Sequence, residues 1–62
     1  MKVKIKGLGT IQGSKETLNL LSMALEQASE LQGKKNHSTV SSLYGRYADD
    51  IYTALKMVGY YD

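Results

Sequence analysis

The chain has 62 residues, with no Cys, Pro, Trp or Phe, one His, five Tyr and a formal net charge of +2. This length allows one domain at most, and the missing cysteines exclude disulfides and thiolate metal clusters. No run approaches the roughly 20 apolar residues of a membrane span, so we expect no membrane partner and a cytoplasmic location. Because a domain this small buries only about 60% of its unfolded surface, we expect it to gain stability by oligomerising.

Residues 2–12 predict a β-hairpin. Residues 2–6 alternate Lys with Val3 and Ile5, which is the period-two pattern of a half-buried strand. A three-residue loop at 7–9, Gly-Leu-Gly, would place Ile5 opposite Ile11 on one apolar face. A single long strand is the alternative, because it keeps the same apolar residues on one side.

A first helix is predicted over residues 15–32. Ser14 is a good N-cap, and Gly33 is a typical C-terminal stop. Apolar residues at spacings of three and four predict a buried stripe along this helix, and further apolar residues widen it. The resulting apolar surface is larger than one small hairpin can cover. The stripe consists of Leu18, Leu21, Leu25, Ala28 and Leu31, and Leu20, Met23 and Ala24 widen it.

A polar loop over 33–38 and a second helix over 39–58 complete the predicted elements, with a short tail at 59–62. Gly45 interrupts the second helix and marks either a kink or a close approach of the first helix. The predicted fold is therefore α+β, a hairpin followed by an antiparallel helix pair (ββαα), in a single domain completed by oligomerisation. The apolar stripe of the second helix consists of Val40, Leu43, Tyr47, Ile51, Ala54 or Leu55, and Val58.

No residue pattern indicates an enzyme. The only His, His37, lies beside lysines in the loop and has no visible orienting partner, so we interpret it as solvated. Asp49 and Asp50 are adjacent on a helix and point about 100° apart, which prevents a carboxylate pair from converging. The glycines around residues 7–13 lack the spacing of a dinucleotide site. We therefore predict no catalytic residue, no metal and no cofactor.

Residues 37–43, His-Ser-Thr-Val-Ser-Ser-Leu, resemble the Thr-Val-Ser start of the recognition helix in helix-turn-helix repressors. The similarity covers about five residues and would imply DNA binding. The preceding residues depart from that pattern, because Lys34 stands where the family has an apolar turn residue and the connection is longer than three to four residues.

The excess of apolar helix surface instead predicts a small protein-interaction or assembly module that forms a homodimer, or an adaptor for a larger protein. Small accessory proteins of bacteria and their viruses have this size. A nucleic-acid-binding protein is the alternative, because bases stack on Tyr and phosphates bind Lys. The residues expected at a protein interface are Leu20, Met23, Tyr44, Tyr52, Met57, Tyr60 and Tyr61. The residues expected to contact an anion or nucleic acid are Lys2, Lys4, Lys6, Lys34, Lys35 and Arg46.

Overall fold

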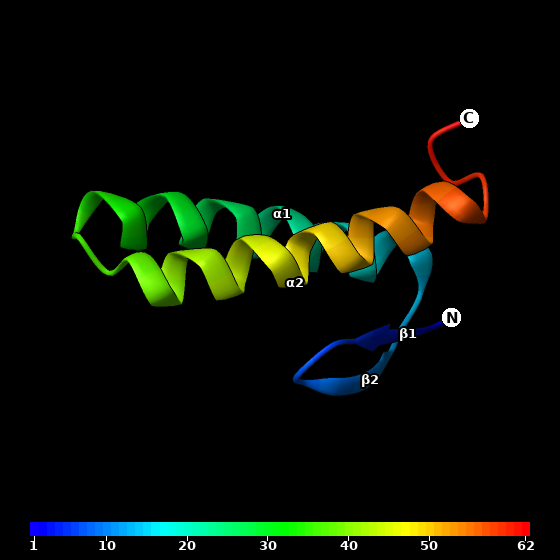
Figure 1. Ribbon diagram of the computed structural model, residues 1–62. Helices are drawn as coiled ribbons and strands as arrows, with labels where there is room; N and C mark the ends of the chain where they lie inside the picture. Colours follow the sequence, from blue (N-terminus) through cyan, green and yellow to red (C-terminus); the bar gives the residue numbers. More distant parts are fainter.

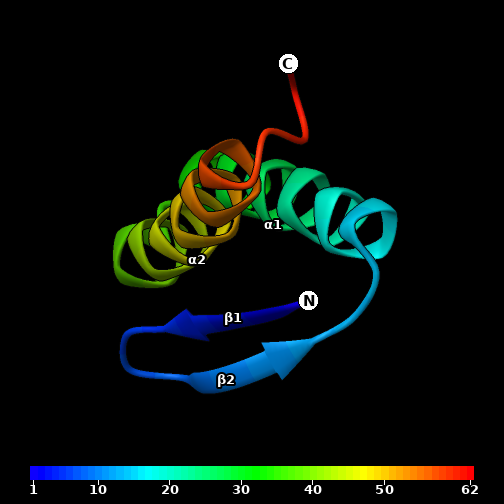
Figure 2. The same ribbon diagram turned by 90° about the vertical axis from the view of Figure 1, so that its right-hand side faces the viewer.

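The computed structural model describes residues 1–62 and consists of a two-stranded antiparallel hairpin followed by two antiparallel helices (Figure 1). This confirms the predicted ββαα order. The hairpin lies along one side of the helix pair, with the first strand nearer the helices than the second (Figure 2). The elements are β1 (Lys2–Ile5), β2 (Gly9–Gln12), α1 (Lys15–Lys34) and α2 (Ser38–Met57).

The predicted register of the hairpin is wrong by two residues. Ile5 pairs with Gly9 and Val3 pairs with Ile11, so the loop is at 6–8 and not at 7–9. The amide of Leu8 donates to the carbonyl of Ile5 at 3.0 Å and closes a turn whose third residue, Gly7, has φ 86°. A positive φ at that position favours glycine, and this requirement outweighs a direct Ile–Ile pair. Because the shift is even, Val3 and Ile5 keep their common apolar face.

The loop between the helices is shorter than predicted. α1 continues through Gly33 to Lys34, and α2 begins at Ser38 and ends one residue before the predicted position 58. The left-handed residue at the connection is Asn36, with φ 63°, and not Gly33. Asn tolerates this conformation better than most residues with a side chain, so no glycine is needed there.

The helices run side by side and antiparallel (Figure 1). They do not cross steeply, as the two helices of a helix-turn-helix do at about 90–120°. The resemblance over residues 37–43 is therefore confined to the sequence. At the start of α1, the predicted cap is confirmed, because the Ser14 hydroxyl accepts from the Thr17 amide at 3.1 Å. Neither helix has the length and apolar character that crossing a membrane requires.

The buried core lies where β1 meets α2 and the start of α1. Ile51 and Leu55 are fully buried and contact the strand that begins the chain. Such side chains supply most of the burial energy of a small domain, at roughly 25 cal/mol per Å². The apolar core cluster consists of Val3, Ile5, Leu18, Ile51 and Leu55.

The predicted buried stripe of α1 is wrong in part. Leu21 and Leu31 are 39% and 51% exposed, whereas Ser22 is buried and Ser29 is half-buried against α2. Compared with the prediction, α1 is turned about its axis so that Ser22 and Ser29 face α2. Small side chains at these positions allow the two helix backbones to approach closely. The leucines consequently remain outside the helix pair.

Reciprocal hydrogen bonds explain how serines fill this helix contact. The Ser29 hydroxyl donates to the Ser41 carbonyl and the Ser41 hydroxyl donates to the Ser29 carbonyl, both at 2.7 Å. The Ser22 hydroxyl donates to the Ala48 carbonyl at 3.1 Å. A Cβ on Gly45 would lie 3.3 Å from the Ser29 hydroxyl oxygen, so Gly45 marks a close approach of the helices. Satisfied hydroxyls avoid the cost of burying unpaired polar groups.

Candidate functional site

A row of apolar side chains covers the side of α1 that is turned away from α2. We call it the α1 outer face and define it as Leu20, Leu21, Ala24, Ala28 and Leu31. At 100° per residue these positions fall within one arc of about 100°, on the opposite side of the helix from Ser22 and Ser29. Leu20 is 65% exposed, although burying a leucine side chain away from water is energetically favourable. The α1 outer face is therefore an apolar surface without a partner in the chain.

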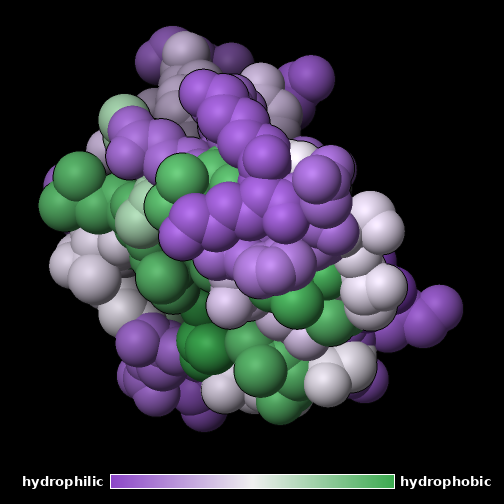
Figure 3. Space-filling model, turned by 90° about the vertical axis from the view of Figure 1, so that its left-hand side faces the viewer, coloured by the Kyte–Doolittle hydropathy of each residue, from purple (hydrophilic) through white to green (hydrophobic).

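Figure 3 looks onto the end of the molecule where α1 and α2 are connected. Hydrophilic surface covers the front of this end, and hydrophobic patches lie to its left and below it. His37 belongs to this polar end, where its Nδ1 lies 2.6 Å from the Gln32 side-chain oxygen. Both side chains lie where the two helices are connected, and the hydrogen-bond partner of His37 is an amide and not a carboxylate.

The tyrosines near the C-terminus pack on one another. The ring of Tyr61 lies 5.1 Å from those of both Tyr52 and Tyr60, tilted by 33° on the first and edge-on at 85° to the second. The Tyr61 hydroxyl donates to the Asn19 side-chain oxygen of α1 at 2.5 Å. Three of the predicted interface tyrosines thus hold the tail against the helices, and Tyr60 packs against the core.

We expect the change Tyr61→Phe to remove a titration step that lies above pH 10.0. Loss of solvent, followed by repulsion from Tyr52 and Tyr60, raises the pKa of the Tyr61 phenol above its ordinary value of 10.0. The neutral phenol donates to Asn19, so this contact is fully present below pH 10 and is lost as pH rises through the raised pKa. Tyrosinate absorbance followed against pH measures the effect.

The control for this titration is Tyr44→Phe, which removes a phenol outside the cluster and should leave the Tyr61 step in place. A step above pH 10.0 that persists in Tyr61→Phe would contradict the assignment.

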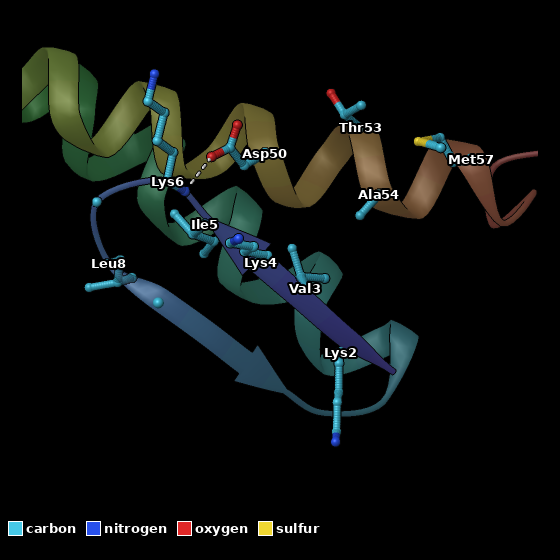
Figure 4. Close-up of a pocket in the computed structure, with 12 residues that line it drawn as sticks. Lys2, Val3, Lys4, Ile5, Lys6, Leu8, Asp50, Thr53, Ala54 and Met57 are labelled. Carbon is cyan, nitrogen blue, oxygen red and sulfur yellow. Dashed lines mark hydrogen bonds between the residues drawn. The ribbon is translucent and has the colours of Figure 1, made fainter.

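A groove of about 770 Å³ runs along β1 beside the C-terminal half of α2 (Figure 4). Val3 and Ile5 line it from the strand, and Ala54 and Met57 line it from the helix. Met57 is 82% exposed, the most exposed large apolar side chain of the chain. The groove is open to solvent and combines an apolar lining with the hairpin lysines.

Lysines dominate the charge of this groove. Lys2, Lys4 and Lys6 line it, and Asp50 is the only acid among the lining residues. One carboxylate oxygen of Asp50 accepts from the Lys6 backbone amide at 3.3 Å (Figure 4). Asp49 lines a separate hollow with Glu26, so the two aspartates diverge as the sequence indicates.

The residues predicted to contact anions fall into two groups. Lys2, Lys4 and Lys6 lie on the hairpin, and Arg46 lies beside its turn, 3.5 Å from the position of a Cβ on Gly7. Lys34 and Lys35 are at the connection of the helices. The stretch of α2 between Ser38 and Asp50 rises roughly 18 Å, which separates the two groups.

The residues predicted at a protein interface likewise do not form one surface. Leu20 is on the α1 outer face, Met57 is at the groove, and the tyrosines of the tail form their own cluster. Met23 is half exposed and accepts from the Asn19 amide at 3.9 Å, next to that cluster. Tyr44 is half-buried in the first half of α2, apart from the others.

Sequence reasoning missed the groove and its lining by Leu8, Thr53 and Ala54. The signal that was present is the alternation of Lys with apolar residues, which marks an edge strand with a cationic face. No cluster of three or more potential metal-ligating His, Cys, Asp or Glu side chains is found. Comparison of the chain with protein-family models, curated proteins and solved structures gave no match.

Proposed function

We propose that this chain is a non-enzymatic interaction or assembly module that self-associates through the α1 outer face. The observation that carries the proposal is the exposure of Leu20, Leu21 and Leu31 along one side of a 20-residue helix. A core of so few buried side chains leaves a small domain marginally stable, and covering this face adds apolar burial. Repetition at spacings of three and four suits packing against another helix.

A second copy fits this face by charge as well as by hydrophobicity. In a two-fold pair the α1 helices run antiparallel, so that each patch meets itself. With the axis near Ala24 and Leu25, Lys34 of one protomer lies level with Glu16 of its partner. The acidic first turn and the basic last turn of α1 are then opposed. Antiparallel helix dipoles add a further favourable term.

We expect sedimentation equilibrium at micromolar concentration to give about twice the chain mass of 6.9 kDa. The double change Leu20→Gln/Leu31→Gln should return the mass to that of one chain, because it removes apolar surface without adding charge. The matched control is Met57→Gln/Val58→Gln, which alters two exposed apolar residues outside the α1 outer face. A monomeric natural chain, or a double variant that stays dimeric, would contradict the proposal.

Nucleic-acid binding is the second candidate, favoured by the position of Arg46 beside the hairpin turn. Together with Lys2, Lys4 and Lys6 it gives the hairpin side of the molecule a basic surface. Binding through phosphates would weaken steeply as salt rises. The absence of binding to a single-stranded oligonucleotide at about 50 mM salt would remove this candidate.

A further inference from the structure

The outer edge of β1 has main-chain groups without partners. Met1 and Gly13 exchange two backbone bonds, at 2.9 and 3.0 Å. Paired residues of an antiparallel ladder alternate between bonded and non-bonded, so Val3 and Ile5 also bond to β2. The amides and carbonyls of Lys2 and Lys4 therefore point away from β2, toward the groove. They are the hydrogen-bonding edge that a third strand would need.

The groove beside this edge has room for an extended segment. Ala54 and Met57 of α2 overlie the position where a third strand would run, and Lys2 and Lys6 stand at its two ends (Figure 4). Side chains of a strand alternate between two sides, so every second residue of such a segment would pack on Ala54 and Met57. The remaining residues would lie on the same side of the sheet as Lys2 and Lys4, which share parity on β1.

Charge decides which segment fits. The side chains of Lys2, Lys4 and Lys6 are exposed, and the nearest acid lining the groove, Asp50, already accepts from a backbone amide. A second copy of β1 would bring lysines opposite lysines, which destabilises a strand pair. Acidic side chains at the same positions would instead form cross-strand ion pairs.

We propose that the β1 edge binds an extended segment of a partner protein in which acidic and apolar residues alternate. The segment adds a third strand, with its backbone bonded to Lys2 and Lys4. Its acidic residues lie beside the three lysines, and its apolar residues fill the groove against Ala54 and Met57. This mode, in which an edge strand captures an extended peptide, takes affinity from the backbone and specificity from alternate side chains.

The probe for the test is a five-residue peptide, Glu-Val-Glu-Val-Glu, labelled with fluorescein at its N-terminal amine and amidated at its C-terminus. Fluorescence anisotropy should show saturable binding that weakens on the order of tenfold in Lys4→Glu. The matched control is Lys15→Glu, which makes the same charge change outside the groove and should leave binding unchanged. A chain carrying Lys2→Glu, Lys4→Glu and Lys6→Glu together should in turn bind a Lys-Val-Lys-Val-Lys peptide that the natural chain does not bind.

Binding by strand addition depends on main-chain hydrogen bonds, whereas binding by charge attraction alone does not. The same acidic peptide, N-methylated at the amides that would face β1, keeps its charge but loses its main-chain donors. Binding should weaken by about tenfold, because the peptide can no longer donate main-chain hydrogen bonds to β1. In amide NMR spectra, the signals of Lys2 and Lys4 should move on binding of the unmethylated peptide.

Three results would overturn the proposal. One is no saturable binding of the acidic peptide up to about 1 mM, a level that corresponds to roughly 4 kcal/mol. Another is equal binding of the methylated peptide. The third is equal binding of an oligonucleotide of the same charge, which would make the lysines a general polyanion surface. Because the groove lies apart from the α1 outer face, peptide binding should persist in Leu20→Gln/Leu31→Gln, which separates this test from that of self-association.

Discussion

Replacing Leu55 by Ala is expected to destabilise the chain by about 2–5 kcal/mol. Leu55 is fully buried and lies in the cluster that joins α2 to β1. A domain of this size has a total stability of roughly 3–9 kcal/mol, so the variant should lose a large fraction of its free energy of unfolding. Urea denaturation followed by helical circular dichroism measures the change.

The matched control for Leu55→Ala is Met57→Ala, two residues later on the same helix. Met57 is 82% exposed, and its truncation should change stability by less than about 0.5 kcal/mol. If both variants lost the same stability, the assignment of the core to the β1-facing side of α2 would be wrong.

Replacing Ser29 by Leu should cost about 2–4 kcal/mol, although it adds an apolar side chain to a helix. The change removes the 2.7 Å bond from the Ser29 hydroxyl to the Ser41 carbonyl, and it places a larger group where the Ser29 hydroxyl oxygen is already only 3.3 Å from the position of a Cβ on Gly45. Overpacking and loss of the donor to a half-buried carbonyl both destabilise. Thermal and urea unfolding should both show the loss.

The control for the serine prediction is Ser42→Leu, the same chemical change at an exposed position of α2. It should alter stability by less than about 0.5 kcal/mol. Ser29→Ala should lie between the two, because it loses the hydrogen bond that the Ser29 hydroxyl donates and introduces no clash. Equal stability of Ser29→Leu and Ser42→Leu would show that the helices do not approach closely at Gly45.

The local elements were predictable because they depend on short-range rules. Alternation identified the hairpin, and the cap at Ser14 and the apolar spacing identified the helices. The hairpin register was not recovered, since the positive φ values of Gly7 and Gly9 outrank the pairing of two isoleucines. Parity nevertheless put Val3 and Ile5 on the correct face.

The relative placement of elements was less predictable. Because leucine is more hydrophobic than serine, the apolar pattern predicted that Leu21 and Leu31 contact the second helix. The residues that do so are Ser22 and Ser29. Close helix packing depends on size and on satisfied hydroxyls, which apolar periodicity does not report. The groove could not be anticipated either, because it arises from how the hairpin leans on a helix more than 40 residues away.

The core joins the first strand to the last helix, and this has a consequence for folding during synthesis. Val3 and Ile5 are covered mainly by Ile51 and Leu55, with α1 lying between them in the chain. Until α2 has emerged from the ribosome, the hairpin and α1 have little to be buried against. A two-stranded hairpin alone is marginal in water. The chain must therefore acquire its core in one late step, with its apolar strand exposed to other binders until then.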